Sequence, residues 1–332
     1  MKAIVTERAG GPEVLRLAEV ERPAIERGDQ VLVHLKAVGV NPIDYKMRND
    51  LDRFPVTKPA ILGCDGAGVV MAVGSEVERF KPGDEVYFCQ PGFNGRQGTY
   101  AEYAVVDEAL VAFKPKTLDF VHAAAVPLVL LTAWEALYDR ARLQSGQRLF
   151  VPGGAGGVGH LAVQLAKLAG AEVVSSVSTE EKARFVQALG ADRVIRYRDE
   201  DVVESVRAWA AGEGVDVAFD TVGDEVFAQC CAAAKVYGDL VTILLPPPNV
   251  DWTDARIRNL RISLEMMLTP VLLELPRWKQ HQGHILASAA KLFDEGKLKV
   301  QVAKTFPLAE AAAAQRYLQD ERPIGKVVLL ID

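Results

Sequence analysis

Glycine residues are concentrated at one point of the chain, where residues 153–159 read GGAGGVG. Three of them, Gly154, Gly156 and Gly159, match the pattern G-x-G-x-x-G. In this pattern the first glycine permits a tight turn, the second admits a pyrophosphate against the backbone, and the third lets a helix pack closely on a strand. Free N–H groups at the start of the helix would then face the phosphates. We expect a pyrophosphate-binding turn here; a simple glycine-rich turn is the alternative.

The segments on either side of the glycines favour the pyrophosphate interpretation. An apolar run, Leu149 to Val151, comes before them and is typical of a strand. The segment HLAVQLAKLAG comes after them, and its apolar residues are spaced as on one side of a helix. They are Leu161, Val163, Leu165 and Leu168. Strand, turn and helix in this order form the context in which the glycine pattern binds a dinucleotide.

The end of the next expected strand indicates which dinucleotide would bind. A site for NAD places an aspartate or glutamate about 20 residues beyond the glycines, where it accepts a hydrogen bond from the ribose 2′-hydroxyl. Here that stretch reads VVSSVSTEEK, and no carboxylate closes the strand. Hydroxyl and ammonium donors suit the 2′-phosphate of NADPH, which a carboxylate would repel. The donors in this stretch are Ser176, Ser178, Thr179 and Lys182.

The same polar residues also have an ordinary structural interpretation. Ser178 to Glu181 has the sequence of a capping box, in which Ser178 would cap the following helix. Lys182 would then be a solvated surface charge. The two interpretations are compatible, and the missing carboxylate is the stronger signal. We therefore predict NADPH rather than NADH as the cofactor.

Composition limits the other functions that the chain could have. Its 332 residues suffice for two domains, and no apolar run approaches the roughly 18 residues of a membrane span. The first residues lack the apolar core of a signal peptide, so we expect a cytoplasmic protein. The formal net charge of −6 is spread along the chain without a basic block, which makes nucleic-acid binding an unfavoured function.

The cysteines indicate packing rather than chemistry. None belongs to a C-x-x-C pair, so neither a disulfide framework nor a cysteine-rich zinc site is expected. Two are adjacent in a helical stretch, which is more typical of buried packing residues than of a disulfide. The cysteines are Cys64, Cys89, Cys230 and Cys231.

By pattern, the chain divides into three segments. Residues 1–123 show short apolar runs separated by glycine and proline, which is typical of a β domain. Residues 124–268 alternate between strand and helix patterns, which predicts a doubly wound parallel sheet. Residues 269–332 contain a long helix, an alanine-rich helix and the closing strand GKVVLLI. The expected fold class is α/β.

A series of motifs follows an order that one family shares. They are KAVGVNPIDYKMR, LGCDGAGVVMAVGSEV, FKPGDEVYF, GTYAEYAVV, VPLVLLTAWEAL, GGAGGVGHLAVQLAKLAGAEVV, LGADRVIRYR, DTVG and GKVVLLI. Together they resemble the medium-chain dehydrogenase/reductase superfamily, and more narrowly its zinc-independent quinone oxidoreductase branch, which includes zeta-crystallin. The resemblance covers nearly the whole chain. It implies a GroES-like β domain, residues 1–123 and 269–332, and a Rossmann domain, residues 124–268, that binds NADPH.

The positions that hold zinc in related alcohol dehydrogenases are altered in this chain. Those enzymes supply a cysteine from GICGTD, a His-Glu pair from GHE, and a further cysteine or carboxylate before the Rossmann domain. This chain has Asn41 at the first position, Cys64 and Asp65 at the second, and no ligand in AAVPLVLLTAW. A catalytic zinc needs three protein ligands, so we expect no metal. Without a Lewis acid, an acceptor that is already electron-poor is the natural substrate.

The resemblance implies an NADPH-dependent reductase of quinones or of α,β-unsaturated carbonyls, and it assigns roles to particular residues. Asn41 and Thr132 are expected at the nicotinamide end of the cofactor. Asp44 and Tyr45 are expected on the substrate side, with Tyr45 a weak candidate for the proton donor. Structural alternatives are a turn residue before proline for Asn41, a helix hydroxyl bonded to its own backbone for Thr132, and a wall residue for Tyr45.

The resemblance also assigns residues to the phosphates of the cofactor. Lys182 and Tyr197 are expected to hold the 2′-phosphate end. Arg322, in the segment ERPIGK, is a further candidate for the phosphates; a solvated loop charge is equally open. The residues expected at the pyrophosphate are Gly154, Gly156, Gly157 and Val158.

Turnover and assembly are the two remaining expectations. The alternative to an enzyme is an NADPH-binding redox sensor, structural protein or RNA-binding regulator with little turnover.

The segment NLRISLEMML, Asn259 to Leu268, is predicted as an edge strand of the parallel sheet, and long exposed edges are a liability because they favour pairing with other chains. Pairing with its copy would give a homodimer and bury Ile262, Leu264 and Met266. Coverage of the edge by the C-terminal helices of a monomer is the alternative.

Overall fold

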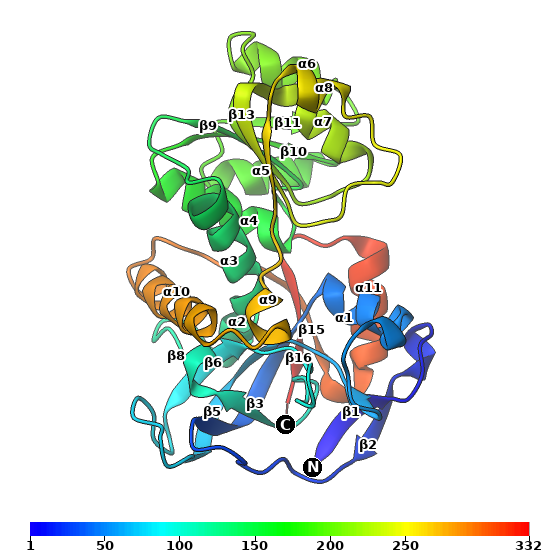
Figure 1. Ribbon diagram of the computed structural model, residues 1–332, viewed down its shortest axis with the longest axis vertical. Coiled ribbons are helices and arrows are strands. Elements are labelled where there is room, and N and C mark those ends of the chain that lie inside the picture. The colour runs from blue at the N-terminus through cyan, green and yellow to red at the C-terminus, as the bar shows by residue number, and fades with distance from the viewer. Residues whose placement is uncertain (332) are drawn as a thin grey trace. The chain divides into compact units, whose positions relative to one another are not determined.

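The computed structural model describes residues 1–331, which form two compact units (Figure 1). Unit 1 contains Met1–Leu128 and the chain from Leu268 onward, and unit 2 contains Val129–Met267. The boundaries expected from the sequence were residues 123 and 268. The first division instead falls inside the apolar helix α3 (Pro127–Trp134), where composition carries no signal of a boundary.

The main sheet of unit 1 joins segments from both ends of the chain. Its order is β15-β16-β3-β5-β6-β8, and β7 also pairs with β3. The late strand β16 is antiparallel to β3 and places Val327 opposite Val40, directly before Asn41. These strands are β3 (Gln30–Val40), β5 (Asp65–Val73), β6 (Glu85–Cys89), β7 (Tyr103–Asp107), β8 (Val111–Phe113), β15 (Val302–Pro307) and β16 (Lys326–Leu330). A second sheet, ordered β2-β1-β4, contains β1 (Lys2–Thr6), β2 (Arg16–Glu19) and β4 (Ala60–Ile61).

The helices of unit 1 pack on these sheets. The long helix α10 lies so close to the chain before β8 that a Cβ atom on Gly283 would come within 2.2 Å of the Ala109 carbonyl oxygen. Tyr87 of β6 donates a hydrogen bond of 2.6 Å to the Leu286 carbonyl oxygen of the same helix. The helices are α1 (Pro42–Asn49), α2 (Phe120–Ala124), α9 (Thr269–Leu272), α10 (Pro276–Asp294) and α11 (Ala311–Glu321). Short 3₁₀ turns lie at Pro12–Val14, Leu51–Arg53, Glu108–Leu110 and Leu308–Glu310.

Unit 2 contains one parallel sheet in the order β11-β10-β9-β12-β13-β14. All of its neighbouring strands are parallel, which confirms the predicted doubly wound sheet. The strand order reverses between β9 and β12, and ligands of such sheets bind outside the carboxyl ends of the strands at that point. The strands are β9 (Arg148–Pro152), β10 (Glu172–Val177), β11 (Arg193–Arg196), β12 (Val215–Asp220), β13 (Ala234–Thr242) and β14 (Arg261–Leu264).

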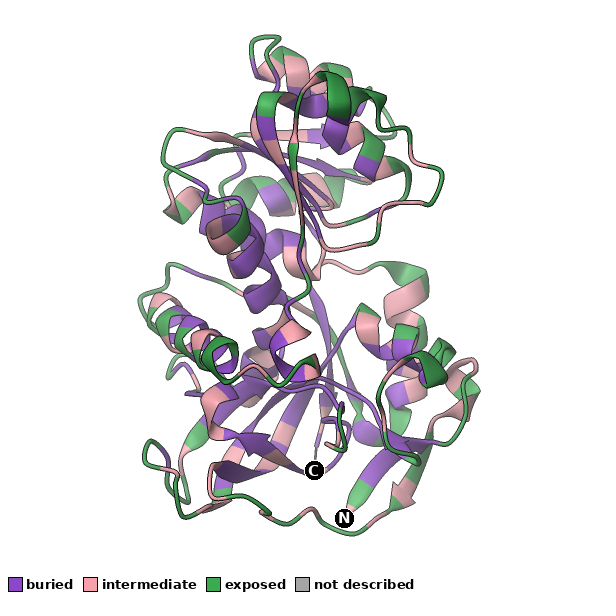
Figure 2. Cartoon of the chain, in the orientation of Figure 1, coloured by how far each residue is buried: buried purple, intermediate pink, exposed green. Residues whose placement is uncertain are grey.

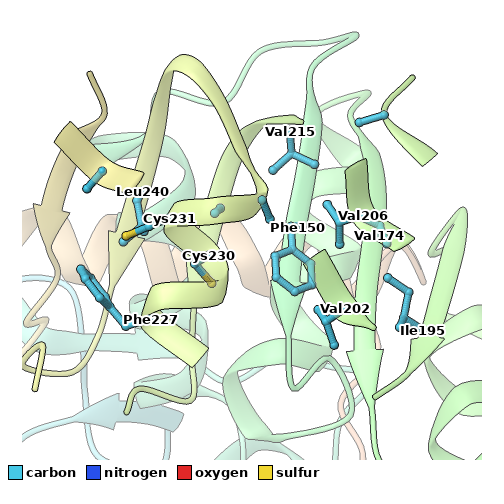
Figure 3. Packing of buried hydrophobic residues seen from close by; sticks show 14 residues of the cluster. Phe150, Val174, Ile195, Val202, Val206, Val215, Phe227, Cys230, Cys231 and Leu240 are labelled. Atoms are coloured by element: carbon cyan, nitrogen blue, oxygen red, sulfur yellow. The ribbon is translucent and has the colours of Figure 1, made fainter. Parts of the chain in front are cut away.

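Helices cover both faces of this sheet. An apolar cluster fills the space between the strands and the helices α6, α7 and α8, and includes Phe150, Val206 and Phe227 (Figure 3). Cys230 and Cys231 lie in this cluster as buried free thiols, as the packing interpretation predicted. The helices are α3, continued by the π-helical segment Glu135–Arg140, α4 (Gly157–Leu168), α5 (Glu180–Ala188), α6 (Val202–Trp209), α7 (Glu225–Ala233) and α8 (Thr253–Ile257).

Burial follows the expected pattern within each unit. The central strands β3, β6, β9, β10 and β12 are largely buried, whereas β2, β14 and β15 are mostly exposed or half-buried (Figure 2). None of the helices within residues 1–331 combines the length and the apolar character that a membrane crossing requires.

Candidate functional site

The glycine-rich turn connects β9 to α4 at the carboxyl edge of the unit 2 sheet. Gly153 has a φ of +71°, a left-handed conformation that favours glycine. Its N–H donates to the Ser176 carbonyl oxygen at 2.9 Å, and its carbonyl oxygen accepts from the Gly156 N–H at 2.9 Å. The sequence pattern assigned the tight turn to Gly154. The hydrogen bond from Gly156 to Gly153 closes a turn that has Gly154 as its second residue, and the left-handed conformation occurs just before it, at Gly153.

The three glycines of the pattern have distinct spatial roles. A Cβ atom on Gly154 would lie 2.2 Å from the Ser175 hydroxyl oxygen, and one on Gly159 would lie 2.3 Å from the Gly153 carbonyl oxygen. Both positions therefore need glycine for packing within the protein. A Cβ atom on Gly156 would meet only the Gly153 carbonyl oxygen, at 3.3 Å, so this position has open space beside the backbone.

Helix α4 begins in the same turn. Gly157 and Val158 are its first two residues, and backbone N–H groups at this position have no acceptor within a helix. They carry the positive end of the helix dipole. The turn therefore offers room at Gly156 and donors at Gly157 and Val158, which are the two properties that a pyrophosphate requires.

The loop after β12 forms the other side of the point where the strand order reverses. The Asp220 carboxylate accepts hydrogen bonds from the Val222 and Gly223 N–H groups, at 3.0 and 2.8 Å. It also accepts from the Thr242 hydroxyl at 2.9 Å. The Thr221 hydroxyl donates to the Pro152 carbonyl oxygen at 2.7 Å and so ties this loop to the glycine-rich turn. Asp220 and Thr221 were not among the predicted site residues, although DTVG directly after a strand was the available signal.

The polar residues after β10 gather at the same edge of the sheet. Thr179, not Ser178, caps α5: its hydroxyl accepts the Lys182 N–H at 3.3 Å. The predicted capping by Ser178 is wrong by one residue, because the chain stays extended through Thr179, with φ −136° and ψ 160°. Ser178 is half-buried, and its hydroxyl makes no hydrogen bond among the described residues.

Tyr197 joins this group from the next strand. It follows β11, and its N–H donates to the Val177 carbonyl oxygen at 3.1 Å, which places it beside the end of β10. Its side chain is 47% exposed. The structure thus brings Ser178, Lys182 and Tyr197 to one edge, whereas Ser176 is buried within the strand. Glu180, the acidic residue that begins α5, pairs with Arg184 and Arg196.

In unit 1, a polar cluster lies at the start of α1. Asn41 precedes the helix and is fully buried. Its backbone N–H donates to Asp44 Oδ2 at 2.8 Å, and the Tyr100 hydroxyl donates to the same oxygen at 2.8 Å. Cys64 Sγ lies 3.7 Å from Asp44 Oδ1. Burial raises the pKa of Asp44 to about 7, although the hydrogen bonds from Asn41 and Tyr100 act in the opposite direction.

A second carboxylate, that of Asp65, adjoins this cluster. The Asn41 side-chain Nδ2 donates to Asp65 Oδ2 at 2.8 Å, and the Leu128 N–H donates to Asp65 Oδ1 at 2.7 Å. Lys326 Nζ lies 3.6 Å from Asp65 Oδ2 and also donates to Asn41 Oδ1. Sequence reasoning missed Lys326, whose only local signal was its place before an apolar strand.

The other residues expected around the substrate and the nicotinamide lie in different elements. Tyr45 is half-buried on α1, where burial raises the pKa of its phenol and the Arg322 and Arg48 guanidinium groups act in the opposite direction. Arg322 has a left-handed φ of 45° at the end of α11. Thr132 lies on α3 in unit 2 and is 5% exposed. The roles expected for these residues stay predictions.

The donor groups at the zinc positions do not suit a metal. Burial raises the pKa of the Cys64 and Cys89 thiols well above the ordinary value, so these groups stay protonated and are poor ligands. Asn41 Oδ1 already accepts from the Lys326 ammonium group, whose charge would repel a cation. Within residues 1–331, no three histidine, cysteine, aspartate or glutamate side chains gather in a metal-binding arrangement.

Comparisons with known proteins cover the whole chain. A family model described as the alcohol dehydrogenase GroES-like domain matches residues 27–116, and one described as zinc-binding dehydrogenase matches residues 189–329. The 2-methylene-furan-3-one reductase of Solanum lycopersicum is 42% identical over 99% of this chain and 79% of its own length. A quinone oxidoreductase of Pseudomonas aeruginosa is 34% identical over 97% of both chains.

A solved structure agrees with these relatives. The Escherichia coli quinone oxidoreductase in complex with NADPH superposes with a TM-score of 0.88 over all of both chains, at 28% identity. The strand order of unit 2, the glycine-rich turn and the altered zinc positions agree with this grouping. The chain therefore belongs to the medium-chain dehydrogenase/reductase superfamily, in its zinc-independent quinone oxidoreductase-like branch.

Proposed function

We propose that the protein is an NADPH-dependent reductase of quinones or α,β-unsaturated carbonyls that works without a metal. The observation that carries this proposal is the carboxyl edge of the unit 2 sheet, which combines an open glycine backbone with the unpaired Ser178 hydroxyl. The relatives support the acceptor class, because one is named for an enone and two are named for quinones. NADPH, when bound, supplies a hydride for a conjugated acceptor.

The residues of unit 2 fit NADPH better than NADH. No carboxylate stands at the end of β10, where a site for NAD would need one. Ser178 and Lys182 supply a hydroxyl and an ammonium donor, and Tyr197 adds a phenol beside them. These donors would hold the 2′-phosphate, and the N–H groups of Gly157 and Val158 would hold the pyrophosphate.

Unit 1 would orient the acceptor and deliver the proton. Reduction of a quinone or an enone leaves an oxyanion or an enolate that must be protonated. Tyr45 is our candidate for the donor, because its phenol is half-buried and lies in the field of two guanidinium groups, those of Arg322 and Arg48. Asn41 and Thr132 are proposed for the nicotinamide end. Asp44 is fully buried, so we propose that it holds the first turn of α1, which carries Tyr45.

The experiment that tests this function measures NADPH oxidation by the purified protein. The acceptor panel contains 9,10-phenanthrenequinone, 1,4-benzoquinone and a set of enones, each with a control for non-enzymatic reduction. Saturable turnover above that control supports the reductase. Turnover at background across the panel, together with tight NADPH binding, would instead favour a sensor, structural or RNA-binding protein.

Assembly and location are further proposals. Strand β14 pairs only with β13 among the described strands, and Leu264 and Met266 beside its open edge are 56% and 48% exposed. We propose that two copies pair through this edge, which would continue the sheet across a twofold axis. Ile262, also expected in that interface, packs partly against the core of its own unit. A cytoplasmic location is a further proposal, and cell fractionation can test it.

A further inference from the structure

The interior of unit 1 holds one ammonium group among oxygen atoms from different strands. Lys326, the first residue of β16, is 3% exposed. Its Nζ donates to the Val40 carbonyl oxygen at 3.1 Å and to Asn41 Oδ1. It also lies 3.6 Å from Asp65 Oδ2. An ammonium group has three donors and no acceptor, so two of its donors are used by hydrogen bonds and its charge is paired with the carboxylate.

Asn41 is held on both sides by this arrangement. Its Oδ1 faces the ammonium group, and its Nδ2 donates to Asp65 Oδ2 at 2.8 Å. The opposite orientation of the amide would place the Nδ2 donor against the ammonium group and the Oδ1 acceptor against the carboxylate. Both of these contacts would be repulsive. The charges of Lys326 and Asp65 therefore determine how Asn41 is oriented.

The same contacts reach the beginning of α1. Asn41 precedes the helix, and its backbone N–H donates to Asp44 Oδ2. Val40 is the last residue of β3, and its carbonyl oxygen accepts from Lys326. The position at which the chain leaves β3 and starts the helix is thus bound to the ammonium group, and Tyr45 follows within the first turn.

A buried ammonium group has a high desolvation cost, and its presence needs compensating contacts. Lys326 is the one cation that forms an ion pair with Asp65 in the part of the chain that the structure describes. Lys326 supplies a buried positive charge, and the surrounding oxygen atoms hold it in a fixed place. This cluster lies at the positions where related enzymes hold zinc.

We propose that Lys326 is a positioning residue for the reductase reaction, and that its ammonium group orients Asn41, Asp65 and the start of α1 as a bound metal cation orients its ligands. The inference rests on the proposed reductase function. Lys326 acts through Asn41 and α1 and does not itself contact the substrate or the cofactor.

Loss of the ammonium group has a specific electrostatic consequence. Burial raises the pKa of Asp65, and Lys326 acts in the opposite direction, as do hydrogen bonds from Asn41, Leu128 and Cys89. The remaining groups that face this region are the Asp44 carboxyl and the Cys64 thiol, and neither supplies a positive charge. In Lys326→Met, the pKa of Asp65 therefore rises further, and the carboxylate is unpaired at alkaline pH but neutral at acidic pH.

The test compares the unchanged protein with Lys326→Met and with the double variant Lys326→Met/Asp65→Asn. Turnover and the Michaelis constants are measured from mildly acidic to mildly alkaline pH, and NADPH binding is measured directly by calorimetry. We expect kcat of Lys326→Met to fall by about 10- to 100-fold at alkaline pH and to recover only in part as the pH is lowered, because protonation of Asp65 does not restore the contact to Asn41 Oδ1. NADPH affinity should change by less than about threefold, because Lys326 would act only on Asn41 at the nicotinamide end, whereas the groups of the glycine-rich turn and the end of β10 belong to unit 2.

The double variant separates positioning from general stability. It has neither the ammonium nor the carboxylate charge, and it still lacks the donor to Asn41 Oδ1 and the Val40 carbonyl oxygen. We therefore expect it to lose the pH dependence of the single variant but to stay about 10-fold or more slower than the unchanged protein. Unchanged kcat in Lys326→Met would overturn the inference. A folded double variant that turns over as fast as the unchanged protein would also overturn it, and this variant decides the question if Lys326→Met does not fold. Absence of turnover in the unchanged protein would refute the reductase function itself, and the inference with it.

Discussion

Cofactor selection at the end of β10 is the most direct consequence of the structure that can be tested. We predict that Ser178→Asp reverses the preference for NADPH. Ser178 is half-buried, its hydroxyl makes no hydrogen bond among the described residues, and it lies next to the residue that caps α5. A carboxylate here would stand where an NAD site has one, so it would repel a 2′-phosphate and could accept from a 2′-hydroxyl.

The magnitude follows from charge repulsion in a partly solvated site. Two unit charges about 5 Å apart repel by about 3 kcal/mol at an effective dielectric constant of about 20, and salt reduces this value. Loss of the Ser178 donor to a charged phosphate adds about 1.5 kcal/mol or more. A net loss of about 3 kcal/mol corresponds to about 150-fold weaker NADPH binding, since 1.4 kcal/mol is tenfold. One new hydrogen bond to NADH, worth about 1 kcal/mol, would tighten its binding by about fivefold.

Isothermal titration calorimetry with both cofactors measures these changes. The matched control is Ser145→Asp, which adds the same charge at an exposed position before β9, at the opposite end of the sheet. Five residues of β9 separate the two ends by about 16 Å, which exceeds the screening length at physiological salt. The control should leave both affinities nearly unchanged. Equal weakening of NADPH and NADH by Ser178→Asp would show that this residue does not face the 2′ position.

The remaining predictions concern the phosphate site, the metal, a buried acid and the dimer. Lys182→Ala should raise the Michaelis constant for NADPH with little change for NADH, because it removes a charge-assisted contact worth about 1.5 to 3 kcal/mol; equal effects on both cofactors would contradict the assignment. Purified protein should contain less than stoichiometric zinc by mass spectrometry and keep its activity after chelation, and one tightly held zinc lost together with activity would overturn the mechanism. Burial raises the pKa of Asp44 to about 7, so its folded state retains a proton that the unfolded state releases above about pH 4. The unchanged protein should therefore lose about 1.4 kcal/mol of unfolding free energy per pH unit relative to Asp44→Asn up to about pH 7, measured by urea denaturation, and a constant difference would contradict this. Leu264→Pro should convert a dimer to a monomer in light scattering while NADPH still binds, whereas a monomer before substitution would exclude pairing through β14.

Local features of the nucleotide-binding edge could be predicted from the sequence because their determinants lie close together in the chain. The glycine pattern, the strand before it and the helix after it fall within one short segment, and the parallel sheet followed from the alternation of strands and helices. The error there was a shift of one residue. The cap of α5 is Thr179 rather than Ser178. The left-handed residue of the glycine-rich turn, Gly153, directly precedes the G-x-G-x-x-G pattern, which does not identify it. A spacing pattern identifies the turn, but backbone dihedral angles decide which residue adopts the special conformation.

The polar cluster of unit 1 could not be predicted in the same way. Lys326 and Asn41 are 285 residues apart in the chain, and their contact exists only because β16 pairs with β3. In the sequence, a lysine before an apolar run has the appearance of a solvated strand end. The family resemblance implied a place for Asp44 on the substrate side, and that role stays a prediction. Its carboxylate is fully buried and accepts a hydrogen bond from the Tyr100 hydroxyl. Burial of a charged side chain depends on partners that a local pattern does not contain.

The contacts of Lys326 also change the meaning of the altered zinc positions. Counting ligands treats Asn41 as a missing cysteine, and it leads to the conclusion that the site has simply lost its metal. In the structure Asn41 lies between an ammonium group and a carboxylate, and each of its polar side-chain atoms has a partner. A cysteine at this position would remove one of the oxygen acceptors of the ammonium group, and a metal ion would then have to lie beside a buried positive charge. Restoring zinc ligands alone would therefore not restore a zinc site, because the Lys326 charge would also have to be removed.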